Sequence, residues 1–297
     1  MILFDRLIDQ AISNQMEYLT LRTVVEKEIL HHDILRILND SGLLKSLVFI
    51  GGTCLRVCYG SSRLSEDLDF TAGRDFNIQV FNELADVFKE SFLRKYDLPV
   101  EVRVPKENDS SVKTWKLLIQ TRPEHHLPVQ RIHIDINRLP SYDISPRMIR
   151  NNYGIDLGTS GLIFWVESRT EIITDKYLAL GLRLNRLKNR DLWDIIWLHQ
   201  TGFKPDAGLL IKKLHDYNTD KDYYIECMAE RIVSLSETPQ VYTDFKKEMV
   251  RFLPVSIVSE TIESLEFWTY LKTIIQETWK LLRSEITGKN TGIKFLM

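Results

Sequence analysis

Two aspartates separated by one residue are the feature of this sequence best suited to chemistry. Asp67 and Asp69 lie in an alternating polar and apolar segment, Ser65–Phe70, which predicts a β-strand. Residues two apart on a strand share a face, with α-carbons about 6.5–7 Å apart, so both carboxylates can serve one metal site. Such oxygens suit Mg²⁺ (or Mn²⁺) in nucleotidyl transfer. An isolated D-x-D pair, however, is more often the solvated face of an ordinary strand.

A glycine turn upstream of the aspartates favours the metal site over an ordinary solvated strand. The apolar run Ser46–Ile50 predicts a buried strand, and Gly51-Gly52-Thr53 follows it, with Thr53 able to cap a helix that ends at Gly60. Backbone N–H groups at such a turn can bind phosphate, although paired glycines also form ordinary turns. A strand, a glycine turn, a helix and a second strand with D-x-D together indicate a combined metal and phosphate site.

These segments resemble the signature of the polymerase-beta-type nucleotidyltransferase superfamily, and more closely that of the AbiEii/AbiGii toxin group. The pattern is G-G-T at 51–53, R-x-S-x-D-x-D at 63–69, a helical lysine at 176 and R-D-x-x-D at 190–194, and it spans about residues 45–200. The resemblance implies an α/β (α+β) fold, in which a nucleotidyltransferase core with a mixed sheet precedes a helical C-terminal domain.

The resemblance also implies roles for individual residues. The set that it places in the site is Gly51, Gly52, Thr53, Asp67, Asp69, Lys176 and Asp191. Asp67 and Asp69 would hold the metal ion, and the glycine turn would contact the phosphates of a nucleoside triphosphate. Ser65 matches a serine that is modified in some relatives, although an ordinary loop serine fits equally well. Asp135, in the alternating run 132–137, is the candidate for the superfamily's third carboxylate, as a metal ligand or as a base.

Charged residues on the later helices extend the candidate site. Lys176 can hold a triphosphate as a point charge, and Arg183 returns to nearly the same helix face about two turns later. Phosphates of a nucleotide or of RNA would suit Arg183, but a solvated helix face explains both residues equally well. One of Asp191 and Asp194 can orient Lys176 or Arg183 while the other caps the helix or faces water, and the resemblance favours Asp191.

The periodicity of apolar residues predicts the elements that position these groups. Residues 5–39 show the spacing of two helices, and 78–95 that of one long amphipathic helix. Further strands are expected at Val100–Val104, Thr114–Gln120, Val129–Asn137 and Leu162–Val166. From Glu171 onward the pattern is helical. We therefore predict a nucleotidyltransferase domain with N-terminal helices over residues 1–168 and a helical domain over 169–297.

Composition narrows the class of protein. Hydrophobic residues make up 44% and charged residues 27% of the chain, which excludes a largely disordered protein. The formal charge is −2, so a polyanion such as RNA would have to bind a local patch.

The sequence predicts neither a zinc site nor export from the cytoplasm. The three cysteines show no zinc-binding spacing and favour a reducing cytoplasm. The pairs His31-His32 and His125-His126 and the single His133 also lack such spacing, so we assign no zinc and expect surface or supporting roles. The first residues do not read as a signal peptide, and no apolar run has the length of a membrane span. We expect a cytoplasmic protein with no membrane partner.

The function predicted from these features is Mg²⁺-dependent transfer of a nucleotide from a nucleoside triphosphate to an acceptor. The resemblance implies the toxin of a bacterial toxin–antitoxin or phage-defence system, with tRNA as acceptor in some relatives and a separately encoded antitoxin. One alternative is transfer to a protein or to a small molecule such as an aminoglycoside. Another is a regulatory nucleotide-binding protein whose catalytic set has decayed, which the intact Asp67, Asp69, Lys176 and Asp191 disfavour.

Overall fold

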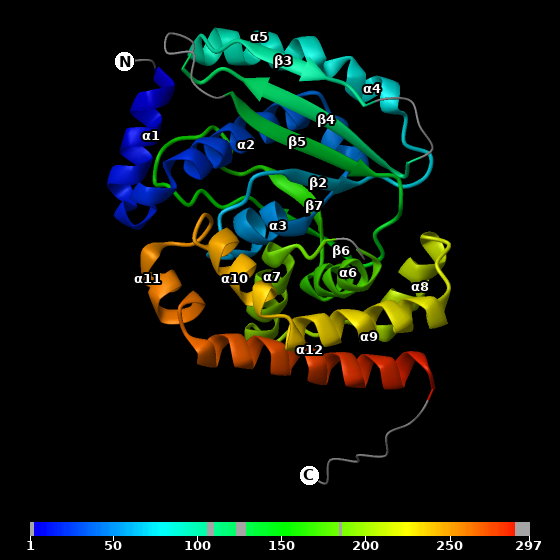
Figure 1. Cartoon of the computed structure of the whole chain (residues 1–297). Helices are drawn as coiled ribbons and strands as arrows, with labels where there is room; N and C mark the ends of the chain where they lie inside the picture. Colours follow the sequence, from blue (N-terminus) through cyan, green and yellow to red (C-terminus); the bar gives the residue numbers. More distant parts are fainter. Residues whose placement is uncertain (1–2, 106–109, 123–128, 184–185, 289–297) are drawn as a thin grey trace. The chain divides into compact units, whose positions relative to one another are not determined.

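A computed structural model describes residues 3–105, 110–122, 129–183 and 186–288 (Figure 1). The chain divides into two compact units. The first runs to Glu167 and includes the returning segment Phe252–Ser256, and the second comprises the remaining residues from Ser168. The Leu64 N–H donates to the Phe252 carbonyl at 2.9 Å, which ties the returning segment to the first unit. The expected pair of domains, 1–168 and 169–297, stays a prediction.

The first unit is built around a mixed sheet. Its strands are β1 (Val48–Ile50), β2 (Leu68–Thr71), β3 (Val100–Arg103), β4 (Val112–Ile119), β5 (Gln130–Asn137), β6 (Ile144–Met148) and β7 (Ile163–Glu167). Their order is β3-β4-β5-β2-β1-β7-β6 (Figure 1). β1 is antiparallel to β2 and parallel to β7, whereas β2 is parallel to β5. The α/β fold class predicted from the sequence is confirmed by this sheet and the helices around it.

One face of the sheet forms the hydrophobic core of the unit. Residues alternate between buried and accessible along β4 and β5, as expected for strands with one covered face. On the covered face, the rings of Phe49 and Phe70 stack with centroids 5.1 Å apart, and Trp115 packs against Phe81 at 4.4 Å. The opposite face of these strands carries the polar residues, so alternation alone directs the candidate catalytic side chains away from the core.

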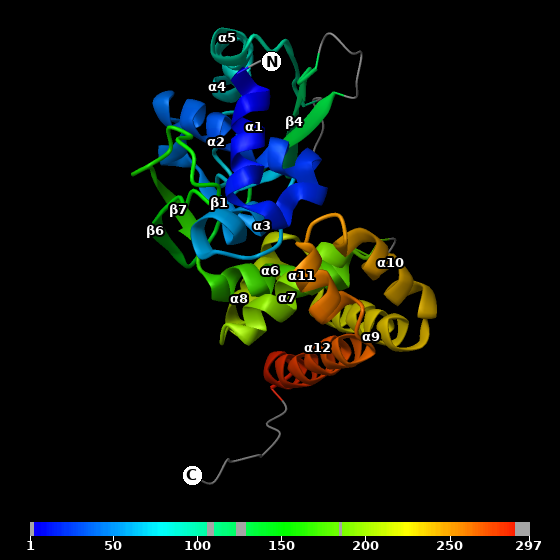
Figure 2. The same ribbon diagram turned by 90° about the vertical axis from the view of Figure 1, so that its left-hand side faces the viewer.

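The first unit contains five helices in its described residues, and the second of them along the chain is the longest. They are α1 (Leu3–Asn14), α2 (Arg22–Asp40), α3 (Gly51–Cys54), α4 (Ile78–Asn82) and α5 (Leu84–Tyr96), with short 3₁₀ or π segments at Met16–Leu21, Leu43–Ser46 and Leu55–Tyr59. Figures 1 and 2 show α4 and α5 at the β3–β4 end of the sheet. Gly60 ends the π segment Leu55–Tyr59 that continues α3, in a left-handed conformation (φ 83°), as its position in the sequence predicts.

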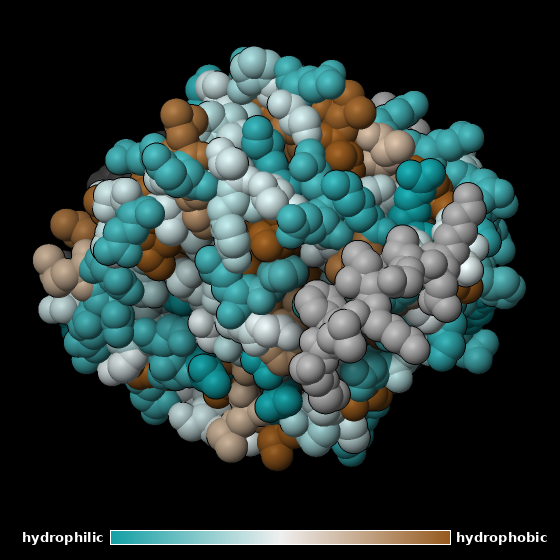
Figure 3. Space-filling model, turned by 90° about the horizontal axis from the view of Figure 1, so that it is seen from below, coloured by the Kyte–Doolittle hydropathy of each residue, from teal (hydrophilic) through white to brown (hydrophobic). Residues whose placement is uncertain are grey.

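All the regular secondary structure in the described part of the second unit is helical. Its helices are α6 (Arg169–Leu182), α7 (Asn189–Gln200), α8 (Ala207–Asp216), α9 (Lys221–Glu237), α10 (Pro239–Met249), α11 (Val255–Ile257), whose first residues belong to the first unit, and α12 (Leu265–Ile286), with a π segment at Val258–Ile262. Aromatic pairs join these helices, including Tyr224 with Trp279 at 5.8 Å. The face seen in Figure 3 is mostly hydrophilic, with scattered apolar side chains of the kind found on ordinary protein surfaces. Within the described ranges, none of the helices combines the length and apolar character needed to cross a bilayer.

Three local expectations from the sequence are corrected by the structure. β6 was not predicted, because it is an exposed edge strand with Pro146 at its centre and no apolar alternation. The helix expected over 78–95 is divided at Glu83 into α4 and α5. Thr53 does not cap α3, since the N-cap position is Ile50 and the Thr53 hydroxyl is bound elsewhere. His125 and His126 lie outside the described residues.

Candidate active site

Two of the predicted carboxylates lie on adjacent strands. Asp69 of β2 is in register with Asp135 of β5, and paired residues of neighbouring parallel strands point to the same face. Thr114 of β4, which is paired with Asp135, donates its hydroxyl to Asp135 Oδ1 at 2.5 Å. Strand pairing therefore brings Asp135 next to the D-x-D pair, and Thr114 fixes its orientation. The sequence pattern did not single out Thr114.

Asp67 lies directly before β2, which begins at Leu68, one residue later than the D-x-D pattern suggests. Its Oδ1 atom is 3.3 Å from Nδ1 of His133 and accepts the His133 backbone N–H at 3.4 Å. The side-chain hydrogen bond with Asp67 raises the pKa of His133 above its ordinary value, although partial burial opposes the shift. The Asp67 carboxylate is thus directed toward β5, the strand that carries Asp135.

The glycine turn lies against these carboxylates. Gly51 has a φ of +75°, and a β-carbon on it would lie 2.6 Å from Oδ2 of Asp69. A side chain at this position is therefore excluded twice, by the backbone conformation and by the neighbouring carboxylate. A β-carbon on Gly52 would lie 2.2 Å from a guanidinium nitrogen of Arg63, which is itself buried. The backbone at Gly51 consequently approaches Asp69 as closely as a side-chain-free residue allows.

Thr53 and Ser65 form a buried connection between the turn and β2. The Thr53 hydroxyl is hydrogen-bonded to the Ser65 hydroxyl at 2.8 Å and to the main-chain carbonyl of Asp67. Both side chains are buried. In this arrangement the two hydroxyls hold the start of β2 against α3, and the group that Thr53 can offer to a phosphate is its backbone.

Helix α2 holds the segment that leads into the D-x-D pair. Glu28 Oε1 accepts the Ser65 N–H at 2.9 Å, Lys27 forms an ion pair with Glu66 at 2.6 Å, and His31 Nε2 is 2.9 Å from the Glu66 carbonyl oxygen. Of the surface and supporting roles expected for His31, the structure shows the supporting one, since its ring is buried and contacts the Glu66 carbonyl. The sequence feature that could have indicated this supporting role is the run of charged residues and histidines inside an otherwise apolar helix.

Glu28 also belongs to a buried charge network that the sequence did not reveal. Its second oxygen accepts Nε of Arg56 at 3.2 Å and the hydroxyl of Tyr153. Burial alone would lower the pKa of Arg56, but Glu28 and the neighbouring tyrosines raise it well above its ordinary value. Arg56 therefore remains charged, and the pair Glu28–Arg56 joins α2 to the segment after the glycine turn.

The donor set of the first unit fits a hard divalent cation. Asp67, Asp69 and Asp135 are half-buried carboxylates on or beside the open face, and oxygen donors of this kind bind Mg²⁺. Across the described ranges, no group of three or more His, Cys, Asp or Glu residues is already placed to hold a metal ion. Mg²⁺ is commonly held by one or two carboxylates, with water and substrate phosphates supplying the other oxygens, so a pair of carboxylates is sufficient.

The second unit contains the other predicted group, centred on Lys176. Its Nζ atom lies 2.5 Å from Oδ1 of Asp191 and 2.9 Å from Oδ2 of Asp194, and Arg183 binds the second oxygen of Asp191. Both aspartates of the R-D-x-x-D pattern therefore bind Lys176. The expectation that one of them caps the helix or faces water is wrong, because Asp194 is fully buried. Arg190 forms an ion pair with Glu248 at 3.3 Å.

A second buried cluster in this unit was not expected. Lys213 Nζ lies 2.7 Å from both Glu171 Oε1 and Asp175 Oδ1, and Glu171 is completely buried. Glu171 and Asp175 are one helical turn apart on α6. This spacing was visible in the sequence, but the lysine that completes the cluster comes from α8.

Replacing Asp191 with asparagine should destabilise the second unit in a pH-dependent way. Burial would raise the pKa of Asp191, but Lys176 and Arg183 outweigh it and hold that pKa well below its usual range. Stability from such a carboxylate is complete above its unfolded pKa of about 3.9 and is lost as the pH falls through the lower folded value. Breaking a buried pair costs about 3 kcal/mol, so Asp191→Asn should lower the free energy of unfolding by about that amount at pH 7 and by less at pH 3.

Urea denaturation of both proteins at the two pH values measures this difference. Glu226→Gln, which removes a carboxylate from an exposed position on α9, serves as the matched control and should change stability little at either pH. An equal loss for Asp191→Asn at pH 7 and pH 3 would contradict the assignment of a low pKa to Asp191.

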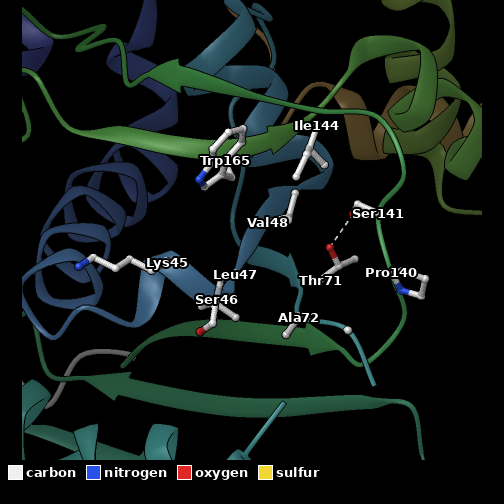
Figure 4. Close-up of a pocket in the computed structure, with 11 residues that line it drawn as sticks. Lys45, Ser46, Leu47, Val48, Thr71, Ala72, Pro140, Ser141, Ile144 and Trp165 are labelled. Atoms are coloured by element: carbon white, nitrogen blue, oxygen red, sulfur yellow. Dashed lines mark hydrogen bonds between the residues drawn. The ribbon is translucent and has the colours of Figure 1, made fainter. Parts of the chain in front are cut away.

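A pocket of about 330 Å³ opens elsewhere in the first unit. Figure 4 shows Val48, Ile144 and Trp165 around it, with the hydrogen bond between Thr71 and Ser141, 2.6 Å long, on one side. Val48 begins β1 and Thr71 ends β2, whereas Gly51 follows β1 and Asp67 precedes β2. The pocket therefore lies at the opposite end of these two strands from the glycine turn and the carboxylates.

The order of these features along the chain agrees with a known family. The family model described as "Nucleotidyl transferase AbiEii toxin, Type IV TA system" matches residues 33–273, a range that includes the carboxylates, the glycine turn and the Lys176 cluster. The chain belongs to this family. As an AbiEii-family nucleotidyltransferase, it belongs to the toxins of type IV toxin–antitoxin systems, and the family implies a nucleoside triphosphate as substrate and a separate antitoxin.

Solved structures support the fold of this AbiEii-family protein. JHP933 from Helicobacter pylori is 18% identical, with a TM-score of 0.50, and the match covers 88% of this chain and 96% of that chain. A candidate nucleotidyltransferase from H. pylori is also 18% identical, with a TM-score of 0.50 and coverage of 87% and 98%. At this identity the likeness concerns the fold alone. Among curated proteins, none matches the sequence significantly.

Proposed function

We propose that this AbiEii-family nucleotidyltransferase uses Mg²⁺ (or Mn²⁺) to transfer a nucleotide from a nucleoside triphosphate to an RNA acceptor, with tRNA favoured. The observation that carries the proposal is the placement of Asp69 and Asp135 in register on one open face, with Asp67 beside them and the Gly51 backbone against Asp69. Growth inhibition in the cytoplasm would follow from modification of the RNA, and the separately encoded antitoxin would oppose it.

The proposed reaction is a displacement at the α-phosphorus of the nucleotide. The acceptor hydroxyl oxygen forms a bond to this phosphorus, the bond to the bridging oxygen of the β-phosphate breaks, and pyrophosphate leaves with that oxygen. A bound Mg²⁺ would neutralise charge on the phosphates. The proton of the acceptor hydroxyl passes to Asp135 or to water, and the Thr114 hydroxyl keeps Asp135 in place while it acts as base or as third metal ligand.

The chain's other residues act in this proposal by binding and positioning. Asp67 and Asp69 hold the metal ion, and the backbone of Gly51, Gly52 and Thr53 contacts the phosphates. Ser65 supports this turn through Thr53. Catalysis by such a site is mainly positioning and charge neutralisation.

The Lys176 cluster is proposed to bind the triphosphate. The support is that Asp191 and Asp194 direct the Lys176 ammonium and that Asp191 also binds Arg183, so two carboxylates fix the positions of two cations. A lysine fixed in this way can bind a phosphate without first losing its side-chain freedom.

A single labelling experiment tests the proposed function. Purified protein is incubated with Mg²⁺, total tRNA and each α-labelled nucleoside triphosphate in turn, beside the Asp67→Ala variant. We expect label to appear on RNA with the unaltered protein and to be lost with the variant, because Asp67 holds the metal ion. Label on a protein or on a small molecule would contradict the RNA acceptor but keep the chemistry. The absence of transfer to any acceptor tested would favour a regulatory nucleotide-binding role.

A further inference from the structure

The strand register places cationic side chains in the rows of the sheet that adjoin Asp67. His133 of β5 contacts Asp67, and Lys116 of β4 is paired with His133. Neighbouring strands are about 4.8 Å apart, so the Lys116 α-carbon lies roughly 10 Å from that of Asp67, on the same face. Arg131 lies two residues before His133 on β5 and also shares this face, about 7 Å farther along the strand.

These side chains are accessible while their sequence neighbours are buried. Lys116 and Arg131 are exposed and His133 is partly exposed, whereas Ile132, Ile134 and Leu117, which alternate with them, are fully buried in the core. The open face of β4 and β5 therefore presents cations beside the carboxylates. We call Lys116 and Arg131, which flank His133, the basic track.

Among the residues that the structure describes, the carboxylates around the basic track are largely neutralised by other cations. On the far side, Glu101 of β3 binds Arg103 of the same strand at 2.5 Å, so this pair is nearly neutral. On the near side lie Asp67, Asp69 and Asp135, and a bound divalent cation would offset most of their charge. A chain with a formal charge of −2 can attract a polyanion only through a local excess of cations, and the basic track is such an excess.

We infer that the basic track binds backbone phosphates of the RNA acceptor next to the hydroxyl that is modified; this inference rests on the proposed function. Lys and Arg side chains contact phosphates and position the nucleic acid, whereas base recognition needs groove contacts or stacking on aromatic rings. No Phe, Tyr or Trp accompanies the basic track on the described open-face positions of β4 and β5. The track therefore holds RNA independently of its sequence and aligns the acceptor with the carboxylates.

The test compares RNA binding by the full chain and by the double variant Lys116→Ala/Arg131→Ala over a range of salt concentrations. The probe is fluorescently labelled total tRNA. Each lost phosphate contact with single-stranded RNA reduces the slope of log K against log salt by about 0.7, so the double variant should lower that slope by about 1.4 and weaken binding at low salt about tenfold. Binding of the nucleoside triphosphate with Mg²⁺ should be unchanged.

Two further variants make the outcome decisive. Lys116→Arg/Arg131→Lys keeps both charges and should restore binding, and Arg6→Ala/Lys89→Ala removes two exposed cations from α1 and α5 and should leave RNA binding intact. If the unaltered protein and the Lys116→Ala/Arg131→Ala variant bind RNA with the same slope of log K against log salt, the basic track does not bind RNA phosphates. The proposed function would still stand in that case. If the unaltered protein does not bind RNA at all, the RNA acceptor and the basic track are both overturned.

Discussion

Replacing Asp69 with asparagine is expected to reduce nucleotide transfer about 10³-fold, because the substitution removes the charge that holds the metal ion and leaves the shape of the side chain unchanged. Asp69 lies at the centre of the candidate site, in register with Asp135 and in contact range of Gly51. Initial rates of label transfer from an α-labelled nucleoside triphosphate measure the effect. Asp67→Asn should cause a loss of similar size, since both carboxylates serve the same metal site.

The matched control for this experiment is Asp75→Asn. Asp75 is an exposed aspartate shortly after β2, so its substitution removes the same charge from the same unit without touching the site. Thermal unfolding of all three variants shows whether the fold is kept. Transfer by Asp69→Asn that stays within tenfold of the unaltered protein would exclude Asp69 as a metal ligand.

Gly51→Ala is expected to reduce transfer about 10²-fold, because a displacement of about 1 Å at a reacting centre is enough for such a loss. The new β-carbon would lie 2.6 Å from Oδ2 of Asp69, so either the carboxylate or the turn has to move. The positive φ of 75° adds a conformational penalty of about 1–2 kcal/mol to the folded state. Rates of label transfer and the free energy of unfolding, measured on the same preparation, separate the two effects.

Gly73→Ala separates backbone strain from displacement of the carboxylate. Gly73 has a φ of +69°, but a β-carbon there would meet nothing within 4 Å. Both alanine variants should therefore lose stability through the backbone penalty, and Gly51→Ala should lose more because of the contact with Asp69 and should alone lose transfer. Equal activity of the two variants would show that the approach of the Gly51 backbone to Asp69 has no catalytic consequence.

Local patterns in the sequence were sufficient to predict the elements that carry the site. Alternation at 65–70 placed Asp67 and Asp69 on one face, and the apolar run before Gly51 predicted a strand that ends in a turn. Both signals depend only on neighbouring residues, since strand periodicity and glycine's conformational freedom are local properties. The order of the motifs was enough to indicate the family, which the match over residues 33–273 confirms.

The partners of these residues depend on pairing between distant segments. Asp135 was a candidate from its own strand, but its position beside Asp69 follows from the parallel pairing of β2 with β5, whose sequences are separated by two helices and two strands. The contact of His133 with Asp67 and the position of Lys116 beside His133 follow from the same register. A pattern of alternation fixes the face of a residue but not its neighbour on the next strand.

The buried polar network around the turn was decided by tertiary structure alone. Thr53 has the sequence position of a helix cap, yet its hydroxyl binds Ser65, because β2 brings that residue against α3. Glu28 sits in an amphipathic helix as any surface glutamate would, and only packing shows it accepting the Ser65 N–H and pairing with Arg56. Burial forces each of these polar groups to find a partner, and which partner is available depends on the packing of segments far apart in the chain.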